Sequence, residues 1–179
     1  MLKHEDIRTV GSGNIGGTNV WRVYGAWYGV PVVLFDTAKG FVPALVATQV
    51  DGHLAGVLAG GAAMLGHWRP LFMGFKRGVK IVATTGWALL GVAPVVGAIG
   101  AAVWLVVFFT TRYASLASIV AGLSIPVAAV ALDYPWPVIV FTGAGAVGIV
   151  LLHRPNIRRL ISGTEHRATL RRAPSARPS

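Results

Sequence analysis

A glycine-rich stretch near the start of the chain has the composition of an anion-binding loop. Four glycines fall within the seven positions from Gly11 to Gly17, with short polar side chains among them. Glycine lets the backbone turn where a side chain would clash, so several N–H groups can point at one anion. A helix beginning near Gly17 would add its dipole, and Arg22 would follow about one turn later as a fixed cation. The stretch predicts a phosphate site, with a structural turn as the alternative.

The glycine spacing also fits a dinucleotide-binding fingerprint, which its context argues against. That fingerprint requires a βαβ unit and an acidic residue about twenty positions further on. Asp36 lies at that distance from Gly16, but a long apolar segment surrounds it and no second βαβ unit follows. A nucleoside-triphosphate loop is not predicted either, because no Gly-Lys-Ser/Thr ending follows the glycines.

The composition indicates an integral membrane protein. Of the 179 residues, 54% are hydrophobic and only 12% are charged. Together with a mean hydropathy of +0.64, these values make the chain too apolar for an ordinary soluble domain. The chain contains no cysteine, which excludes a disulfide framework and a thiolate metal site.

Six apolar segments are long enough to span, or half span, a bilayer. They are residues 27–50, 54–65, 81–90, 95–109, 114–132 and 138–152. We therefore expect an all-α polytopic helical bundle, with a turn at Asp51–Gly52, a helix end at Gly91 and Pro94, and a kink at Pro126. The Gly- and Ala-rich segment 54–65 suits close packing between helices.

The distribution of charge predicts the orientation of this bundle. If all six segments cross, the loops alternate between two sides, and every Lys and Arg except Lys39 lies on one side. That side includes a basic loop, 67–80, and the positive-inside rule makes it cytoplasmic. The partition explains most of the net charge of +10, so an anionic membrane surface is a better predicted partner than nucleic acid.

The chain is expected to form one membrane-embedded domain with a short tail. Residues 1–165 contain all the apolar segments and polar clusters, whereas residues 166–179 are basic and rich in Pro, Ser and Ala near their end. Such a composition cannot bury enough apolar surface to fold alone. We predict a disordered cytoplasmic tail.

Polar residues on the predicted cytoplasmic side are candidates for chemistry. Asp36 and Lys39 lie one helical turn apart within an apolar segment, which favours a structural ion pair over direct contact with a ligand. His153 and Asn156 share a face if a helix continues there. His153 is then a candidate base or phosphate donor, with a histidine at a membrane boundary as the alternative. Neither His-x-x-x-His nor Glu-x-x-His nor a carboxylate cluster occurs, so no metal site is predicted.

The cations on this side predict phosphate chemistry on an amphipathic substrate. They come from distant parts of the sequence and can converge at the membrane surface. Ser12 and Ser115 are weak candidates for a nucleophile, because no Asp or Glu is evident to complete a triad with either.

Five motifs occur in order along about residues 6–165. They are Gly11 to Asn19 with Arg22; Asp36-x-x-Lys39-Gly40; Gly66-His67-x-x-Pro70-x-Phe72-x-Gly74-Phe75-Lys76; Arg112-Tyr113-x-Ser115-Leu116-Ala117-Ser118; and His153-Arg154-x-Asn156-Ile157-x-Arg159-Leu160-x-x-Gly163-Thr164-Glu165. Their order and types resemble those of the membrane-embedded acyl-phosphate:glycerol-3-phosphate acyltransferases of the PlsY type.

The resemblance implies a reaction and a place in the cell. It implies transfer of a fatty acyl group from acyl phosphate to the 1-hydroxyl of glycerol 3-phosphate, giving lysophosphatidic acid and phosphate in bacterial phospholipid synthesis. It implies a multi-pass protein of the bacterial inner membrane that uses no cofactor. Coenzyme A and acyl carrier protein are not the direct donors in that family, so the enzyme that makes acyl phosphate is a candidate partner.

The resemblance also implies roles for the candidate residues. A phosphate would be held by the loop and neutralised by Arg22; the loop residues are Ser12, Gly13, Asn14, Gly16, Thr18 and Asn19. Glycerol 3-phosphate would be held by Lys80, Ser115, His153 and Asn156. Asp36, Lys39, His67 and Arg112 would support the site, and Glu165 would order the cationic tail. Acyl phosphate already has a good leaving group, so a substrate phosphate or His153 would take the hydroxyl proton.

The sequence departs from the family pattern in two places. The family usually has a further apolar segment before the glycine loop, so a misplaced start, a fragment and a bundle with one helix fewer are all open. The family also has Gly-Gly-Lys-Gly after the Phe-Lys pair, whereas Val79 and Ile81 occupy glycine positions here if Arg77 is an insertion. β-Branched residues resist the positive φ that a glycine pair accepts. These departures make an inactive homologue one alternative function. A transporter of small phosphate esters is the other, since it would use the same cations and a polar path at Asp36 and Lys39.

Overall fold

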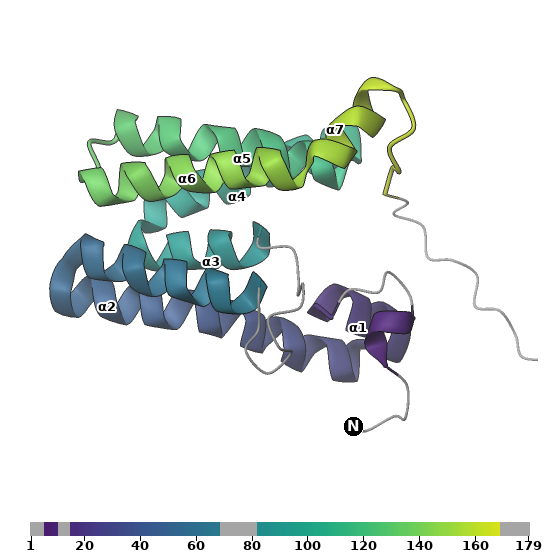
Figure 1. Ribbon diagram of the computed structural model, residues 1–179, viewed down its shortest axis with the longest axis horizontal. Helices are drawn as coiled ribbons and strands as arrows, with labels where there is room; N and C mark the ends of the chain where they lie inside the picture. The colour runs from purple at the N-terminus through teal and green to yellow at the C-terminus, as the bar shows by residue number, and fades with distance from the viewer. Residues whose placement is uncertain (1–5, 11–14, 69–81, 169–179) are drawn as a thin grey trace, which may run out of the picture.

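The computed structural model describes residues 6–10, 15–68 and 82–168, which form helices and turns with no strand (Figure 1). In chain order the elements are η1 (Ile7–Thr9), α1 (Gly17–Tyr24), α2 (Ala26–Trp68), α3 (Val82–Val92), α4 (Pro94–Thr111), α5 (Ala114–Ala131), α6 (Trp136–Leu152) and α7 (Arg154–Ile161). The prediction of an all-α bundle is confirmed. Within the described ranges there is also no βαβ unit to support the dinucleotide alternative.

Helix α2 is a hairpin of two arms, because its backbone leaves helical geometry at Asp51 and Gly52 (Figure 1). Gly52 has a φ of 79°, which glycine adopts freely and other residues adopt only with strain. The arms pack closely, since Cβ atoms built at Gly56 and Gly60 would contact Thr48 and Ala44, respectively, on the other arm. The predicted turn and the close packing of residues 54–65 are both confirmed.

Three helical stretches in the described residues are long and apolar enough to cross a membrane. They are Ala26–His67, Pro94–Thr111 and Ala114–Ala131, and α6 with α7 makes a fourth if this pair, bent by 59°, is one span. The first stretch contains both arms of α2. Helix α3, with 11 residues, is too short to cross a bilayer at full thickness. The six predicted segments thus correspond to the two arms of α2 and to α3, α4, α5 and α6.

Helix α3 packs against α2 at a point that only glycine allows. A Cβ atom at Gly91 would lie 2.7 Å from the carbonyl oxygen of Phe41 and 2.8 Å from the nitrogen of Leu45. The predicted end of this segment at Gly91 and Pro94 is confirmed, since α3 ends at Val92 and α4 begins at Pro94, and Gly91 also serves helix packing. The buried core around the contact comprises Ala44, Ala88, Leu89, Val92, Ala93, Val96, Ala129 and Val138.

Helix α1 folds back along the beginning of α2. Gly25, with a φ of 87°, connects the two helices. A Cβ atom at Gly17 would overlap the side chain of Val33, and one at Gly29 would overlap Trp21, so the helices approach closely. The structure confirms that a helix begins at Gly17.

The polar motifs lie at one end of the bundle, and the turn of α2 lies at the other (Figure 1). Helices α1 and α7 and the last residues of α2 mark the motif end. At the opposite end, the His53 ring meets the Tyr134 ring at a centroid distance of 6.1 Å, which joins the α2 turn to the α5–α6 connection. The two ends therefore separate the loops as the alternating segments predict.

Candidate active site

The carboxylate of Glu165 joins three side chains at the motif end. Its Oε1 accepts hydrogen bonds from the Ser115 hydroxyl at 2.7 Å and from the Asn156 amide at 2.8 Å. Its Oε2 accepts a hydrogen bond from Nε of Arg159 at 2.7 Å. The Glu165 side chain is only 9% exposed. A buried carboxylate is stable in such a place only when hydrogen bonds and a cation compensate for its lost hydration, and both are present here.

The backbone after α7 directs Glu165 back toward the helices. Gly163 has a φ of 71°, the left-handed conformation with which glycine commonly follows a helix end. The N–H groups of Thr164 and Glu165 both donate to the carbonyl of Arg159, at 2.8 and 3.1 Å. A glycine at this position therefore lets the chain reverse and return its carboxylate to α5 and α7.

The surroundings of Glu165 keep it ionised. Burial raises the pKa of this carboxyl, but hydrogen bonds from Asn156, Ser115 and Arg159 and the charge of Arg159 lower it by more, to about 2. Glu165 is thus an acceptor over the whole physiological range and does not supply a proton. This agrees with an ordering role and argues against acid–base work.

His153 occupies the bend between α6 and α7. It is 3% exposed, and its Nδ1 lies 2.9 Å from the carbonyl oxygen of Ile149. Because a carbonyl only accepts, Nδ1 carries the hydrogen, and in the neutral ring Nε2 then has the lone pair. Asn156 follows three residues later on the same buried side of α7. The expectation that His153 and Asn156 share a face is confirmed.

Residues after Glu165 continue across the connection between α4 and α5. The guanidinium of Arg167 lies 5.1 Å from the centroid of the Tyr113 ring, and the N–H of Ala168 donates to the carbonyl of Arg112 at 2.8 Å. Arg112 itself has a φ of 65°, so it ends α4 in a left-handed conformation that costs a non-glycine residue energy. Residues 163–168, which we call the strap, thus run from α7 to the residues just before Ser115.

Asp36, Lys39 and His67 form a second polar cluster, between the two arms of α2. Lys39 donates to the Asp36 carboxylate at 2.5 Å, as the predicted ion pair requires. His67 lies in the last turn of α2 rather than in a loop, because the second arm runs on to Trp68. Its Nδ1 is 3.8 Å from the same carboxylate oxygen, so the register set at the α2 turn brings His67 opposite Asp36.

The described part of the glycine-rich region begins with Ile15. Gly16 precedes α1 and accepts the N–H groups of Asn19 and Val20 at 3.0 and 3.2 Å. Asn19 is 2% exposed, and its amide donates to the carbonyl of Val10 at 3.1 Å. One amide hydrogen of Asn19 therefore ties α1 to Val10, and its predicted contact with phosphate stays a prediction. Arg22 lies in the last turn of α1 and is exposed.

Several predicted site residues cannot be placed. Ser12, Gly13, Asn14 and Lys80 lie outside the described residues, as do the basic loop from residue 69 onward and the altered glycine positions Val79 and Ile81. Thr18 lies on the first turn of α1, and its side chain is not described. The tail from residue 169 also lies outside the described ranges.

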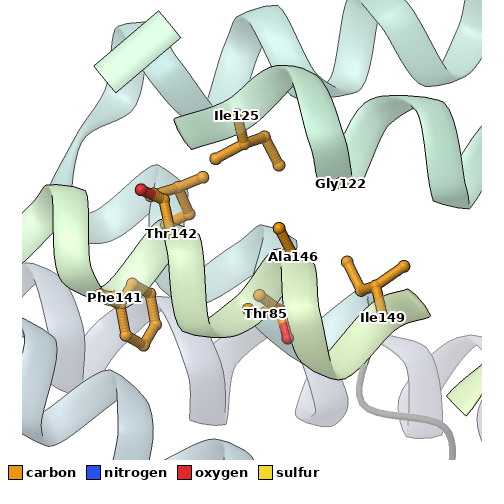
Figure 2. Close-up of a pocket in the computed structure, with 9 residues that line it drawn as sticks. Thr85, Gly122, Ile125, Phe141, Thr142, Ala146 and Ile149 are labelled. Carbon is orange, nitrogen blue, oxygen red and sulfur yellow. The ribbon is translucent and has the colours of Figure 1, made fainter. Parts of the chain in front are cut away.

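A small apolar pocket lies between α3, α5 and α6 (Figure 2). Thr85 and Thr142 are the polar side chains of its lining, and Thr142 donates to the carbonyl groups of Val138 and Ile139 on its own helix. Such a lining suits hydrocarbon and not phosphate. Ile149 lines the pocket and also holds His153 through its carbonyl.

Sequence reasoning misses two contacts at the motif end. The motifs give Arg159 no role and the composition places Arg167 in a disordered tail, yet Arg159 binds Glu165 and Arg167 lies over Tyr113. The spacing of Arg159 and Glu165 around Gly163 was the available signal, because a glycine after a helix can reverse the chain. No sequence signal indicates the contact between Arg167 and Tyr113.

The helices and the cluster define a multi-pass membrane protein with a polar, cation-rich end suited to anionic ligands. The family model for glycerol-3-phosphate acyltransferase matches residues 1–163, and the chain belongs to this family. It is 45% identical to the glycerol-3-phosphate acyltransferase of Aquifex aeolicus over 168 residues, covering 93% of this chain and 87% of the relative. With that of Desulforudis audaxviator it shares 43% identity, covering 96% and 86%.

Two solved structures are also similar. One is the glycerol 3-phosphate form of PlsY, an integral membrane glycerol 3-phosphate acyltransferase, with a TM-score of 0.83 and 42% identity, covering 94% of this chain and 84% of that one. The other is its lysophosphatidic acid form, with a TM-score of 0.79 at the same identity, covering 88% and 81%. The resemblance drawn from the motifs is confirmed.

Proposed function

We propose that this protein, a glycerol-3-phosphate acyltransferase of the PlsY family, transfers a fatty acyl group from acyl phosphate to the 1-hydroxyl of sn-glycerol 3-phosphate. The products are lysophosphatidic acid and phosphate. The observation that carries the proposal is the Glu165 cluster, which gathers Ser115, Asn156 and Arg159 beside the buried His153. Similarity to structures of a glycerol 3-phosphate form and a lysophosphatidic acid form supports this assignment of acceptor and product.

The chemistry requires position and charge more than a protein nucleophile. The acceptor hydroxyl attacks the acyl carbon, and phosphate leaves with the electron pair of the broken bond. The hydroxyl proton goes to a substrate phosphate or to Nε2 of His153. The hydrogen bond from Nδ1 of His153 to Ile149 favours the second route, because it orients the ring and places the lone pair on Nε2. Cations nearby stabilise the charge that develops on the leaving phosphate.

The hydrogen atoms that Ser115 and Asn156 have left after binding Glu165 determine which part of the substrate each can contact. The Ser115 hydroxyl has one hydrogen, which it gives to Glu165, so it offers a substrate only lone pairs. We assign Ser115 to a hydroxyl group of glycerol 3-phosphate and not to its phosphate. Asn156 keeps its second amide hydrogen and its carbonyl oxygen and can contact either part. Glu165 acts through both as a positioning residue.

The phosphate groups are assigned to the cations and the glycine loop. Arg22 is exposed at the motif end, where its planar guanidinium can pair with two phosphate oxygens. Ser12, Gly13, Asn14, Gly16 and Thr18 would cradle the same phosphate, with Ser12 closest to the reacting group. Lys80 would hold the phosphate of the acceptor. Asn19 would belong to the same phosphate site, with its amide nitrogen held by the carbonyl of Val10.

We further propose the setting of the reaction. The motif end carries the cations and faces the cytoplasm of a bacterial cell by the positive-inside rule. Residues 1–165 form the acyltransferase domain and residues 166–179 the tail, of which the first three residues belong to the strap. Acyl phosphate is amphipathic and arrives from the enzyme that makes it, and neither nucleic acid nor a cofactor takes part.

The decisive experiment measures acyl transfer by the purified protein in lipid nanodiscs, with acyl phosphate and labelled glycerol 3-phosphate. Arg22→Ala is expected to lower kcat/KM by at least a hundredfold, whereas Arg22→Lys keeps the charge and recovers part of it. Unchanged thermal unfolding of both variants separates this effect from misfolding, because Arg22 is exposed. Turnover like that of the wild type in Arg22→Ala would overturn the phosphate assignment.

A further inference from the structure

One stripe of α7 is exposed and combines two cations with an apolar side chain. Arg154, Arg158 and Ile161 are all exposed, and Ile161 is 83% exposed. Their spacing places them along one side of a helix. Asn156 lies on the other side of α7, where it is buried and bonded to Glu165. We call the three exposed residues the α7 stripe.

The direction of α7 places this stripe near the membrane surface. Helix α6 continues the spanning bundle, and α7 leaves it at His153 with a bend of 59° (Figure 1). If α6 lies roughly along the bilayer normal, α7 lies closer to the membrane plane than to the normal. A helix in that position, with apolar and cationic side chains on one side, has the character of an interfacial helix.

The charge of the stripe is uncompensated within the protein. Among the described residues, no ion pair joins Arg154 or Arg158 to a carboxylate, and the one acidic side chain bonded to α7, Glu165, is taken by Arg159. Guanidinium groups bind phosphate oxygens well, and an isoleucine one turn beyond the second arginine gains by entering the apolar boundary of a bilayer. Charge complementarity therefore selects an anionic lipid surface.

We propose that the α7 stripe docks on anionic phospholipid headgroups of the surrounding bilayer and so fixes the position of α7. This helix begins directly after His153 and contains Asn156, so its position on the lipid headgroups affects the geometry of the site. Surface electrostatics alone would have the opposite effect, because an anionic bilayer repels anionic substrates. Stimulation of acyl transfer by anionic lipid would therefore indicate docking of the α7 stripe and not a general effect of surface charge. Only the activity readout of this inference rests on the proposed function.

The first test measures depth in the bilayer without any substrate. The chain has no cysteine, so Ile161→Cys gives a single site for a nitroxide label. Accessibility to a water-soluble nickel reagent is compared between phosphatidylcholine nanodiscs and nanodiscs with an equal part of phosphatidylglycerol. We expect severalfold protection of the label by phosphatidylglycerol, which is lost when Arg154→Gln and Arg158→Gln are added. His166→Cys, exposed on the strap beyond the end of α7, serves as the control and stays accessible.

The second test measures acyl transfer in the same nanodiscs. Phosphatidylglycerol is expected to raise kcat/KM severalfold for the wild type and for the variant with Arg154→Lys and Arg158→Lys, but not for the double Gln variant. The proposal is overturned if phosphatidylglycerol leaves either the kcat/KM or the label accessibility of the wild-type background unchanged. It is also overturned if the double Gln variant responds to phosphatidylglycerol as strongly as the wild type does. If no chain transfers acyl groups in any bilayer, the proposed function fails while the label depth still decides the docking.

Discussion

Two carboxylates toward the motif end, Glu165 and Asp36, bind their neighbours in different ways. Glu165 accepts from Ser115, 50 residues away in sequence, as well as from Asn156 and Arg159. Asp36 pairs with Lys39, three residues away on the same helix, and its only other ionic neighbour among the described residues is His67 at 3.8 Å. The Glu165 side chain is 9% exposed and that of Asp36 is 23% exposed.

This difference separates a bond that joins helices from one that belongs to a single helix. Removing Glu165 leaves polar groups on α5 and α7 buried without their acceptor, and each such group costs free energy. Removing Asp36 leaves Lys39, which is 41% exposed and can turn toward water or headgroups. We therefore expect the two carboxylates to differ in stability, in pH dependence and in their effect on the reaction.

Replacing Glu165 should have the largest effect. Glu165→Ala removes all three hydrogen bonds, and we expect a loss of about 3 kcal/mol in the free energy of unfolding, since hydrogen bonds to charged groups are the strong ones. Activity should fall more than tenfold, because Ser115 and Asn156 lose their orientation. Glu165→Gln keeps one acceptor, so its unfolding free energy and activity should lie between those of the wild type and of Glu165→Ala. Thermal unfolding and acyl transfer measured on the same preparation give both numbers; an alanine variant as stable as the wild type would show that the cluster does not join the helices.

The same cluster predicts how stability depends on pH. The pKa of Glu165 is lowered from an ordinary value of 4.5 to about 2, so its contribution is complete above pH 4.5 and is lost as the pH falls from there toward 2. The wild type should therefore lose stability in this window more steeply than Glu165→Gln does. Unfolding temperatures between pH 7 and pH 3 provide the measurement. Parallel curves for the two proteins would mean that the carboxylate is not held in its ionised form.

Replacing Asp36 should have a smaller effect. Asp36→Asn keeps the shape of the side chain and removes its charge, and partly exposed ion pairs contribute about 1 kcal/mol or less. We expect a stability loss within that range and a kcat/KM within about threefold of the wild type. A tenfold loss of activity at unchanged stability would instead place Asp36 in contact with substrate.

The fold could be predicted from the sequence where local chemistry decides. The six apolar segments, the turn at Asp51–Gly52 and the helix start at Gly17 all follow from hydropathy and glycine placement. Gly91 shows the limit of this reasoning, because the sequence places a helix end there but does not indicate that this glycine also admits a neighbouring helix. That contact depends on Phe41 and Leu45, about fifty residues earlier, whose backbone approaches Gly91 in space.

The sequence predicted which residues belong to the site better than it predicted the hydrogen bonds between them. The motifs indicated Ser115, Asn156 and Glu165, but not that the carboxylate accepts from both of the others. Asn19 shows the same limit, since a short polar side chain beside glycines does not indicate in sequence the bond that its amide donates to Val10. Which acceptor a donor finds depends on long-range packing, which a single sequence does not encode in its spacing.

The smallest effect in this comparison is expected for Lys39. Lys39→Met keeps the length of the side chain and removes the cation, which leaves Asp36 with His67 as the nearest group that can carry positive charge. We expect the unfolding free energy to change by less than about 1 kcal/mol, because the pair is local and Lys39 is 41% exposed. The double variant with Asp36→Asn completes a mutant cycle, and its coupling energy measures the ion pair directly.

A coupling energy well above 1 kcal/mol would make the Asp36–Lys39 pair as important for stability as the Glu165 cluster and remove the distinction drawn between the two carboxylates. A small coupling, with activity retained in both single variants, would mean that the end of the hairpin near His67 is held by the packing of the two arms and not by its charges.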